Sequence, residues 1–227
     1  MPAFVGNDIV DLARVDSAKH LESRFVRRVC TEREQEFLRE SSEPELLLWC
    51  YWASKETAFK LISKIDHPPT FIHKKFECMQ LSLRKKHSEV CVKYGDHVMR
   101  IHLNKTPDWL HAIGHFDSTE IRLSGDAGAA RVSKAKKWEL SNWRSLFTER
   151  ELSAITRFES AFVRLRCKQA LAKRFGFEIR DLEIIRPVVN HQSMAPYLLV
   201  NGERSDIDIS LSHHGDWAGW AYCQAAS

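Results

Sequence analysis

Three blocks of this chain recur in the same order, and this repetition constrains the fold more than any other feature of the sequence. The paired blocks are residues 26–38 and 143–155, residues 52–61 and 165–176, and residues 98–115 and 206–223. The first pair shares Thr-Glu-Arg-Glu, starting at Thr31 and Thr148, and the second pair aligns Lys55 with Lys168. A period of about 110 residues is too long for a solenoid repeat, so we predict a duplicated unit folded as a pseudo-dimer. The alternative is coincidence, because Thr followed three residues later by Glu is also an ordinary helix-start signal.

Helices followed by antiparallel strands predict an α+β fold. Each half is expected to form a small antiparallel sheet packed with helices, and the two halves to form a pseudo-twofold dimer. We expect helices at 45–62 and 160–175, and strands at 4–12, across 76–103 with a turn at 94–96, and at 182–189, 196–202 and 207–212. The small, polar stretch 123–137 is the expected seam between a first repeat at 1–122 and a second at 123–227.

Composition narrows the partners without identifying one. The 34 basic and 30 acidic residues are interspersed, and a net charge of +4 suits an anionic small molecule or an acidic protein equally well. A nucleic-acid-binding protein usually has a denser basic patch. The six cysteines are scattered, which favours reduced thiols and a cytoplasmic protein. The absence of a long apolar run and of a signal peptide predicts no membrane span.

Three residues of the first half could carry chemistry together. Asp8 sits in an apolar strand, where a carboxylate must face solvent, a charged partner or a metal. On a helix Glu56 and Lys60 are i, i+4 neighbours, and taken alone they are a surface pair worth about 0.2–0.5 kcal/mol. Taken alone, Asp8 is an exposed or edge position. If the three converge, two carboxylates could hold Mg²⁺ and the lysine could contact a phosphate.

The spacing of these residues resembles that of a known family. Gly6-Asn-Asp8-Ile9-Val10, followed by Trp52-Ala-Ser-Lys55-Glu56-x-x-x-Lys60, is similar to the two signatures of the 4'-phosphopantetheinyl transferase superfamily. The Thr-Glu-Arg-Glu blocks and the segment Ile209-Ser-Leu-Ser212-His213 also have counterparts there, so the resemblance covers nearly the whole chain. Val10 is similar to the holo-acyl-carrier-protein synthase branch, whereas the covalent duplication is similar to the surfactin-type branch. In the latter, the metal motif lies in the second half.

The resemblance implies a Mg²⁺-dependent transfer of the 4'-phosphopantetheine arm of coenzyme A to a serine of an apo carrier protein, releasing adenosine 3',5'-bisphosphate. Asp8 and Glu56 would hold the metal, Glu56 and Lys60 would act in catalysis, and Ser212 and His213 would contact coenzyme A. The site would lie between the halves of a monomer.

Departures from the family pattern refine this expectation. The chain has Met194-Ala195-Pro196 where the family often has Gly-Lys-Pro, so a contact to the 3'-phosphate is lost, and Lys168 or Arg166 is expected to replace it. At the second, equivalent interface Gln169 stands in place of Glu56, and Asn104-Lys105 in place of Ser212-His213. One working site is therefore expected.

The carrier protein is expected to dock through its acidic helix. The resemblance implies that Arg14 faces the carrier, and Arg24, Arg27 and Arg28 could extend this basic rim or be a solvated helix face. Whether the carrier serves fatty acid, polyketide or peptide synthesis stays open. Three rival functions are a degenerate protein that binds coenzyme A or a carrier without transfer, a nucleic-acid-binding module, and a different Mg²⁺-dependent phosphohydrolase.

Overall fold

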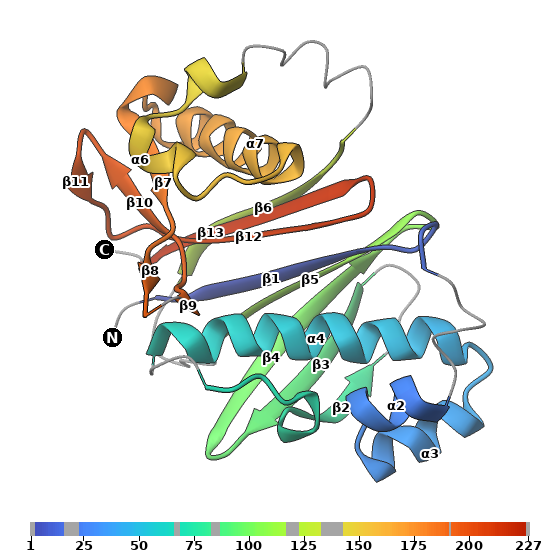
Figure 1. Cartoon of the computed structure of the whole chain (residues 1–227). Coiled ribbons are helices and arrows are strands. Elements are labelled where there is room, and N and C mark those ends of the chain that lie inside the picture. Colours follow the sequence, from blue (N-terminus) through green and yellow to red (C-terminus); the bar gives the residue numbers. More distant parts are fainter. Residues whose placement is uncertain are drawn as a thin grey trace.

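The computed structural model of the chain describes residues 3–15, 23–65, 69–82, 87–116, 123–132, 143–190 and 192–225. Within these ranges helices and antiparallel strand pairs combine into an α+β fold, as the sequence predicted. The strands β1, β12 and β13 lie between the long helices α4 and α7 (Figure 1). No helix in this described part of the chain is long and apolar enough to cross a membrane.

The first half is one five-stranded sheet with the order β1-β5-β4-β3-β2, covered by α4. Its elements are β1 Val5–Asp11, α2 Ser23–Val29, α3 Glu32–Glu40, α4 Pro44–Ile65, the short helix His73–Lys75, β2 Glu77–Ser82, β3 His87–Tyr94, β4 His97–Lys105 and β5 Trp109–Phe116. The core lies between α4 and the sheet, where fully buried side chains such as Leu61, Ile101 and Leu110 meet.

The second half is built around a three-stranded sheet with the order β12-β13-β6, covered by α7. Its elements are β6 Leu123–Arg131, the short helix Trp143–Leu146, α6 Glu149–Leu152, α7 Phe158–Phe175, the short helix Ile179–Asp181, β7 Leu182–Ile185, β8 Val188–Val189, β9 Gln192–Ser193, β10 Tyr197–Val200, β11 Glu203–Arg204, β12 Asp208–His214 and β13 Trp217–Ala225. Strands β11, β10 and β7 form a further small sheet, and β8 pairs with β9. A separate cluster that includes Leu171, Leu182 and Ile209 forms its core.

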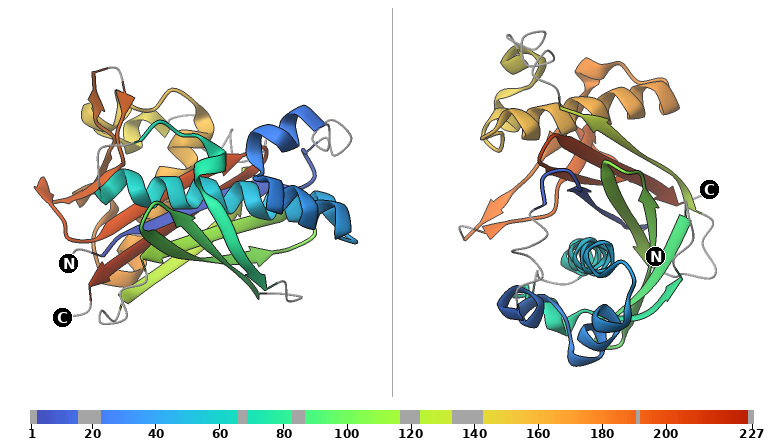
Figure 2. Two further views of the ribbon diagram at one scale, coloured as in Figure 1. Left: turned by 90° about the horizontal axis from the view of Figure 1, so that it is seen from below. Right: turned by 90° about the vertical axis from the view of Figure 1, so that its right-hand side faces the viewer.

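The halves meet where β1 lies beside β12 and β13, in the middle of the molecule (Figure 2). Polar contacts fix this junction: the backbone N–H of Val5 donates to Asp208 Oδ2 (2.7 Å), and that of Asn7 donates to Ser210 Oγ (2.9 Å). Lys64 of α4 also reaches across and donates to Asp208 Oδ2 at 2.7 Å. The junction therefore places β1, which carries Asp8, directly against the strand that carries Ser212.

Most sequence predictions of secondary structure are confirmed. The predicted helices at 45–62 and 160–175 correspond to α4 and α7, and α7 ends before Gly176, which has the left-handed φ of 76° common after a helix. The prediction of a single strand at 182–189 is wrong, because the chain breaks at Pro187 into β7 and β8. Of the expected seam at 123–137, residues 123–131 form β6 and pair with β13 of the second half, and residues 133–137 lie outside the described residues.

Candidate active site

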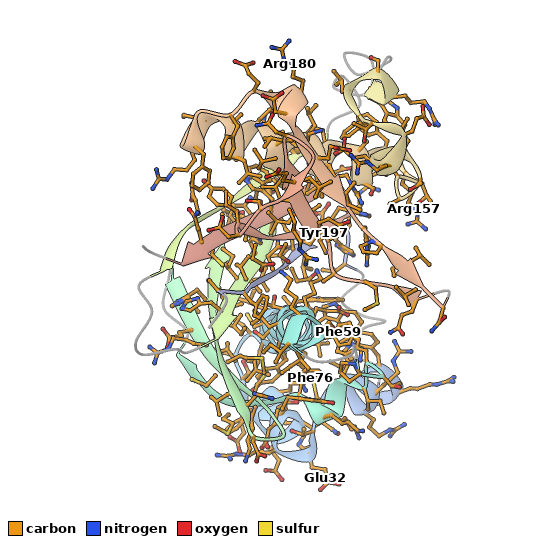
Figure 3. All side chains as sticks on the ribbon, turned by 90° about the vertical axis from the view of Figure 1, so that its left-hand side faces the viewer. Glu32, Phe59, Phe76, Arg157, Arg180 and Tyr197 are labelled. Atoms are coloured by element: carbon orange, nitrogen blue, oxygen red, sulfur yellow. The ribbon has the colours of Figure 1, made fainter. Side chains whose placement is uncertain are left out.

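A cleft of about 280 Å³ opens between the two halves. The first half lines it with Asp8 of β1 and with side chains of α4, and the second half lines it with side chains of α7, of the β7–β10 region and of β12. The lining residues are Asp8, Phe59, Lys60, Ser63, Lys64, Ser160, Val163, Arg164, Arg186, Gln192, Ser193, Met194, Ala195, Pro196, Ser210, Leu211, Ser212 and His213. In Figure 3, Phe59 marks the side of α4, and the labelled Arg157 and Tyr197 mark the second half.

Asp8 and Lys60 meet at the floor of this cleft. Lys60 Nζ lies 3.0 Å from Asp8 Oδ1 and donates to the backbone carbonyl of Asn7 at 2.7 Å. The side chains are 27% exposed for Lys60 and 15% for Asp8, so the pair is partly shielded from solvent. The sequence alone also allowed both residues to be exposed at the surface, and the structure does not place them there. Lys60 has three N–H donors, and these two bonds leave a third for a ligand.

Glu56 lies one helical turn before Lys60, and the positive charge near its carboxyl group does not offset the effects of burial and of Asp8 on its pKa. Burial and the neighbouring charge of Asp8 together raise the Glu56 pKa to about 7, although the charge of Lys60 offsets part of the effect. Its Oε1 lies 3.8 Å from His73 Nε2, too far for a hydrogen bond. Burial lowers the His73 pKa to about 4, so this imidazole is neutral at physiological pH and leaves the carboxylate uncompensated.

The donor set fits a magnesium ion. Asp8 and Glu56 would supply two carboxylate groups, and the charge of Asp8 is one cause of the raised Glu56 pKa, so a cation bound between them would be stabilising. Within the described residues no group of three or more His, Cys, Asp and Glu side chains could cage a metal. Mg²⁺ is commonly held by one or two carboxylates together with substrate phosphates, so two carboxylates suffice.

On the opposite wall, Ser212 and His213 of β12 play different parts. The Ser212 hydroxyl accepts from Asn7 Nδ2 at 2.8 Å, and Asn7 Nδ2 also donates to His111 Nε2 at 2.9 Å. This buried network joins β1, β5 and β12, so Ser212 acts mainly at the junction. His213 lines the cleft, where partial burial of its imidazole lowers its pKa; Glu159 opposes this effect, and the positive charges of Lys60, Arg157 and Arg164 add to it.

Lys168, expected to contact coenzyme A, does not reach the cleft. It is 2% exposed, and its ammonium donates to both carboxylate oxygens of Glu151 at 3.0 and 3.1 Å. Lys55 makes the matching buried bond to Glu34 at 2.6 Å. In both halves the glutamate is the third residue of a capping box, so the repeated Thr-Glu-Arg-Glu and lysine serve the packing of each half.

Arg166, the other expected replacement, faces a different cleft beside α7. That cleft is lined by Asp126, Ala127, Arg166, Gln169, Ala170, Lys173, Arg174, Trp220 and Tyr222.

Arg14, the expected carrier contact, is exposed, and its guanidinium donates to both carboxylate oxygens of Asp216 at 2.9 Å.

Sequence reasoning missed three cationic side chains of the cleft, namely Lys64, Arg164 and Arg186. The residues came from three separate elements, and no short motif joined them. Only the regular spacing of Lys60 and Lys64 along one helix face offered a signal.

Asp8 and several cations converge in this cleft, with the Glu56 carboxyl group nearby, and these are the groups that a phosphate-bearing ligand with a divalent cation would need. The model of the 4'-phosphopantetheinyl transferase superfamily (ACPS) matches residues 4–112 of the chain. The holo-[acyl-carrier-protein] synthase of Caldanaerobacter subterraneus is 24% identical over 118 residues, which cover 50% of this chain and 93% of that protein. The crystal structure of Thermotoga maritima holo-[acyl-carrier-protein] synthase aligns at 16% identity with a TM-score of 0.39, over 59% of this chain and 80% of that one. The latter likeness is too weak for a comparison of the two sites.

Proposed function

We propose that this chain transfers the 4'-phosphopantetheine arm of coenzyme A to a serine of an apo acyl or peptidyl carrier protein, in a Mg²⁺-dependent reaction that releases adenosine 3',5'-bisphosphate. The observation that carries the proposal is the Lys60–Asp8 contact in a cleft whose other wall carries His213, with Glu56 one helical turn before Lys60 and within electrostatic reach of Asp8. The match of residues 4–112 to the superfamily model and the similarity to the holo-[acyl-carrier-protein] synthase of Caldanaerobacter support it.

In this reaction the serine hydroxyl attacks the β-phosphate of coenzyme A, and the bond from that phosphorus to the oxygen bridging to the adenosine side breaks. Asp8 and Glu56 would hold the magnesium ion. Mg²⁺, when bound, supplies positive charge to the pyrophosphate and its leaving oxygen. Phosphoryl transfer needs mainly positioning and charge neutralisation, and the third N–H of Lys60 is available to the transferring phosphate.

Glu56 is our candidate for accepting the serine proton. A general base works best when its pKa lies near the working pH. The metal-free Glu56 carboxyl group has a pKa of about 7, and bound Mg²⁺ would lower this pKa and keep the group ionised and able to accept a proton. The carboxylate would therefore take the proton as the new oxygen–phosphorus bond forms. The neutral His73 beside it does not compete, because its pKa of about 4 leaves it a weak base.

We also propose that the chain is a duplicated pseudo-dimer with repeats at 1–122 and 123–227, which acts as a monomer. Each half has its own core, and each has a capping-box glutamate bonded to a buried lysine. The strand registers support one working site. The repeated blocks 98–115 and 206–223 align Ala112 with Trp220. Asp8 pairs with Ala112 and Gly128 pairs with Trp220, so Gly128 takes the place of Asp8 in the second half. A Cβ on Gly128 would come within 2.2 Å of the Trp220 ring, so no carboxylate fits there.

The carrier is proposed to dock on the basic rim that begins at Arg14. The side chain is 59% exposed, and its partner Asp216 is also accessible, so the acidic helix of a carrier could replace Asp216 at low cost. Arg27 and Arg28 are exposed at the end of α2, which allows the rim to extend.

All six cysteines are free thiols, which is consistent with a cytoplasmic protein.

The proposal is tested by intact-mass spectrometry of an apo acyl carrier protein incubated with the chain, coenzyme A and Mg²⁺. We expect a mass gain of one phosphopantetheine, abolished by EDTA and by Asp8→Ala. The exposed Glu45 lies on the same helix as Glu56, and Glu45→Gln should retain the activity. No gain with several acidic carriers and a folded protein would overturn transfer and favour the degenerate binding protein. Consumption of coenzyme A without a carrier would favour a phosphohydrolase.

A further inference from the structure

One buried nitrogen beside the candidate metal site lacks a hydrogen-bond partner within the described part of the chain. It is Nε2 of His73, the first residue of the short helix His73–Lys75. The atom that it faces is Glu56 Oε1, at 3.8 Å, which lies beyond the roughly 2.7–3.2 Å of an N–H···O hydrogen bond. His73 belongs to none of the sequence motifs of the site, so its place beside a proposed metal ligand needs an explanation of its own.

Two aromatic rings hold the His73 imidazole in place. The centroid of the imidazole lies 4.5 Å from that of the Trp52 ring and 4.2 Å from that of the Phe71 ring. Trp52 lies one helical turn before Glu56, so the ring that packs on the imidazole and the carboxyl group that faces its Nε2 come from one face of α4. The backbone is fixed as well, because the N–H of Phe76 donates to the His73 carbonyl at 3.0 Å. Packing therefore keeps the imidazole beside Glu56.

Packing alone does not account for a histidine at this position. A phenylalanine could lie between the same two rings, and it would bury no polar atom. A buried nitrogen without a partner carries a free-energy cost comparable to that of a lost hydrogen bond. The Glu56 carboxyl group is close enough to remove this cost after a small rotation of either side chain.

The protonation state of His73 suits a hydrogen-bond donor rather than a counter-ion. Burial, together with the positive charges of Lys55 and Arg28, lowers the His73 pKa to about 4, so the ring is neutral at physiological pH. A neutral imidazole carries one N–H, either on Nδ1 or on Nε2. Beside an ionised carboxylate the hydrogen belongs on Nε2, because with the hydrogen on Nδ1 two acceptors would face each other. The Nε2–H tautomer is therefore the form that matches an ionised Glu56.

We propose that His73 is a positioning residue for the metal, whose Nε2–H donates to Glu56 Oε1 and so orients the carboxylate towards the magnesium ion. The presence of magnesium rests on the proposed function, whereas the approach of Nε2 to Oε1 is a feature of the described residues. Carboxylates that bind metals commonly accept hydrogen bonds from neighbouring groups, which fix their orientation. A carboxylate has about four acceptor positions, so this bond leaves room for the metal and for the serine proton.

The test is a titration of the intact chain with Mn²⁺, followed by electron paramagnetic resonance, for the wild type and two variants of His73. His73→Phe keeps an aromatic ring between Trp52 and Phe71 but removes the N–H. His73→Gln removes the ring but keeps an N–H, because its amide nitrogen reaches about as far from the backbone as Nε2 of histidine. We expect His73→Phe to weaken Mn²⁺ binding by about tenfold or more, the usual effect of losing such a partner, and His73→Gln to keep most of the affinity.

The matched control is Lys75→Gln, which changes an exposed residue of the same short helix and should bind Mn²⁺ as the wild type does. His73→Phe should melt no lower than the wild type, because it buries no unpartnered nitrogen. Wild-type affinity in His73→Phe, equal losses in both His73 variants, or no binding of Mn²⁺ by the wild type would overturn the inference.

A measurement on the wild type gives an answer even if His73→Phe does not fold. Long-range proton–nitrogen correlation spectra distinguish the two neutral tautomers of a histidine, and the signal that His73→Gln lacks identifies His73. With Mg²⁺ present, His73 should carry its hydrogen on Nε2. A hydrogen on Nδ1 instead would contradict the proposed bond to Glu56.

Carrier loading separates this inference from the proposed function. With loading observed, His73→Phe should raise the Mg²⁺ concentration that gives the half-maximal rate by about tenfold or more, and saturating Mg²⁺ should restore most of kcat. An unchanged Mg²⁺ requirement in His73→Phe would contradict the role of His73 while leaving transfer intact. If the Mn²⁺ affinities follow the expected pattern but no carrier is loaded, the positioning role stands and the proposed transfer fails.

Discussion

Replacing Glu56 with glutamine should make the metal-free protein more stable while abolishing its activity. Burial and Asp8 raise the Glu56 pKa from its ordinary value of 4.5 to about 7, and each unit of pKa corresponds to about 1.4 kcal/mol. The folded state therefore disfavours the ionised carboxyl group by about 3 kcal/mol relative to the unfolded chain. The side chain is 22% exposed, so solvent screening reduces this figure only modestly.

The sign of the pH dependence follows from the raised pKa. Between pH 4.5 and about 7 the folded protein keeps the Glu56 proton that the unfolded chain has lost, so stability falls as pH rises through this range. Above pH 7 the loss is complete. Glu56→Gln has no charge to bury, so its advantage should be absent near pH 4.5 and reach as much as about 3 kcal/mol at pH 8.

The assay is urea denaturation in EDTA at pH 5 and pH 8, for the wild type, Glu56→Gln and the control Glu45→Gln. The control removes an exposed carboxylate from the same helix and should change stability by less than about 0.5 kcal/mol. Adding Mg²⁺ at a hundredfold its dissociation constant should stabilise the wild type by about 2.7 kcal/mol and Glu56→Gln far less. A Glu56→Gln variant that gains nothing at pH 8, or gains equally at pH 5, would refute the reasoning.

Two further predictions concern the packing of the second half and the junction. Glu151→Gln leaves the buried ammonium of Lys168 without its carboxylate, so it should destabilise the protein by about 3–5 kcal/mol in urea denaturation, and an unchanged midpoint would contradict the structural role given to this lysine. Gly219→Ala would place a Cβ 2.9 Å from His111 Nε2 and 3.0 Å from Ser212 Oγ, inside the network that joins the halves. This overpacking should cost about 1–3 kcal/mol and lower both the melting temperature and the rate of carrier loading, whereas a fully active, equally stable variant would show that the network tolerates separation.

The sequence predicted those parts of the fold and site that depend on local spacing. The helix α4 could be predicted because residues 45–62 lack Gly and Pro, and the helical periodicity places Glu56 and Lys60 on one face. The pairing of these residues with Asp8 could be predicted from the family resemblance, since the strand and the helix lie in the same half. The Lys60–Asp8 contact at 3.0 Å agrees with that expectation.

Other features depend on tertiary packing that spacing cannot reveal. A helical lysine can face inward or outward, and Lys168 faces inward because the capping-box Glu151 meets it inside the second core. Residues 123–131 looked like a linker because they are small and polar, yet Gly128 is small because the Trp220 ring lies where its side chain would be. Arg164 and Arg186 join the site only because the β1–β12 junction brings the second half against α4.

The most direct measurement is a crystal structure of the chain with coenzyme A and Mn²⁺ in place of Mg²⁺. The central claim is that one composite site between the halves holds both the metal and the nucleotide. We predict anomalous signal from Mn²⁺ between the carboxylates of Asp8 and Glu56, with the pyrophosphate next to Lys60. Coenzyme A bound instead in the cleft beside α7 that Arg166 and Trp220 line, or Mn²⁺ away from Asp8 and Glu56, would contradict the account.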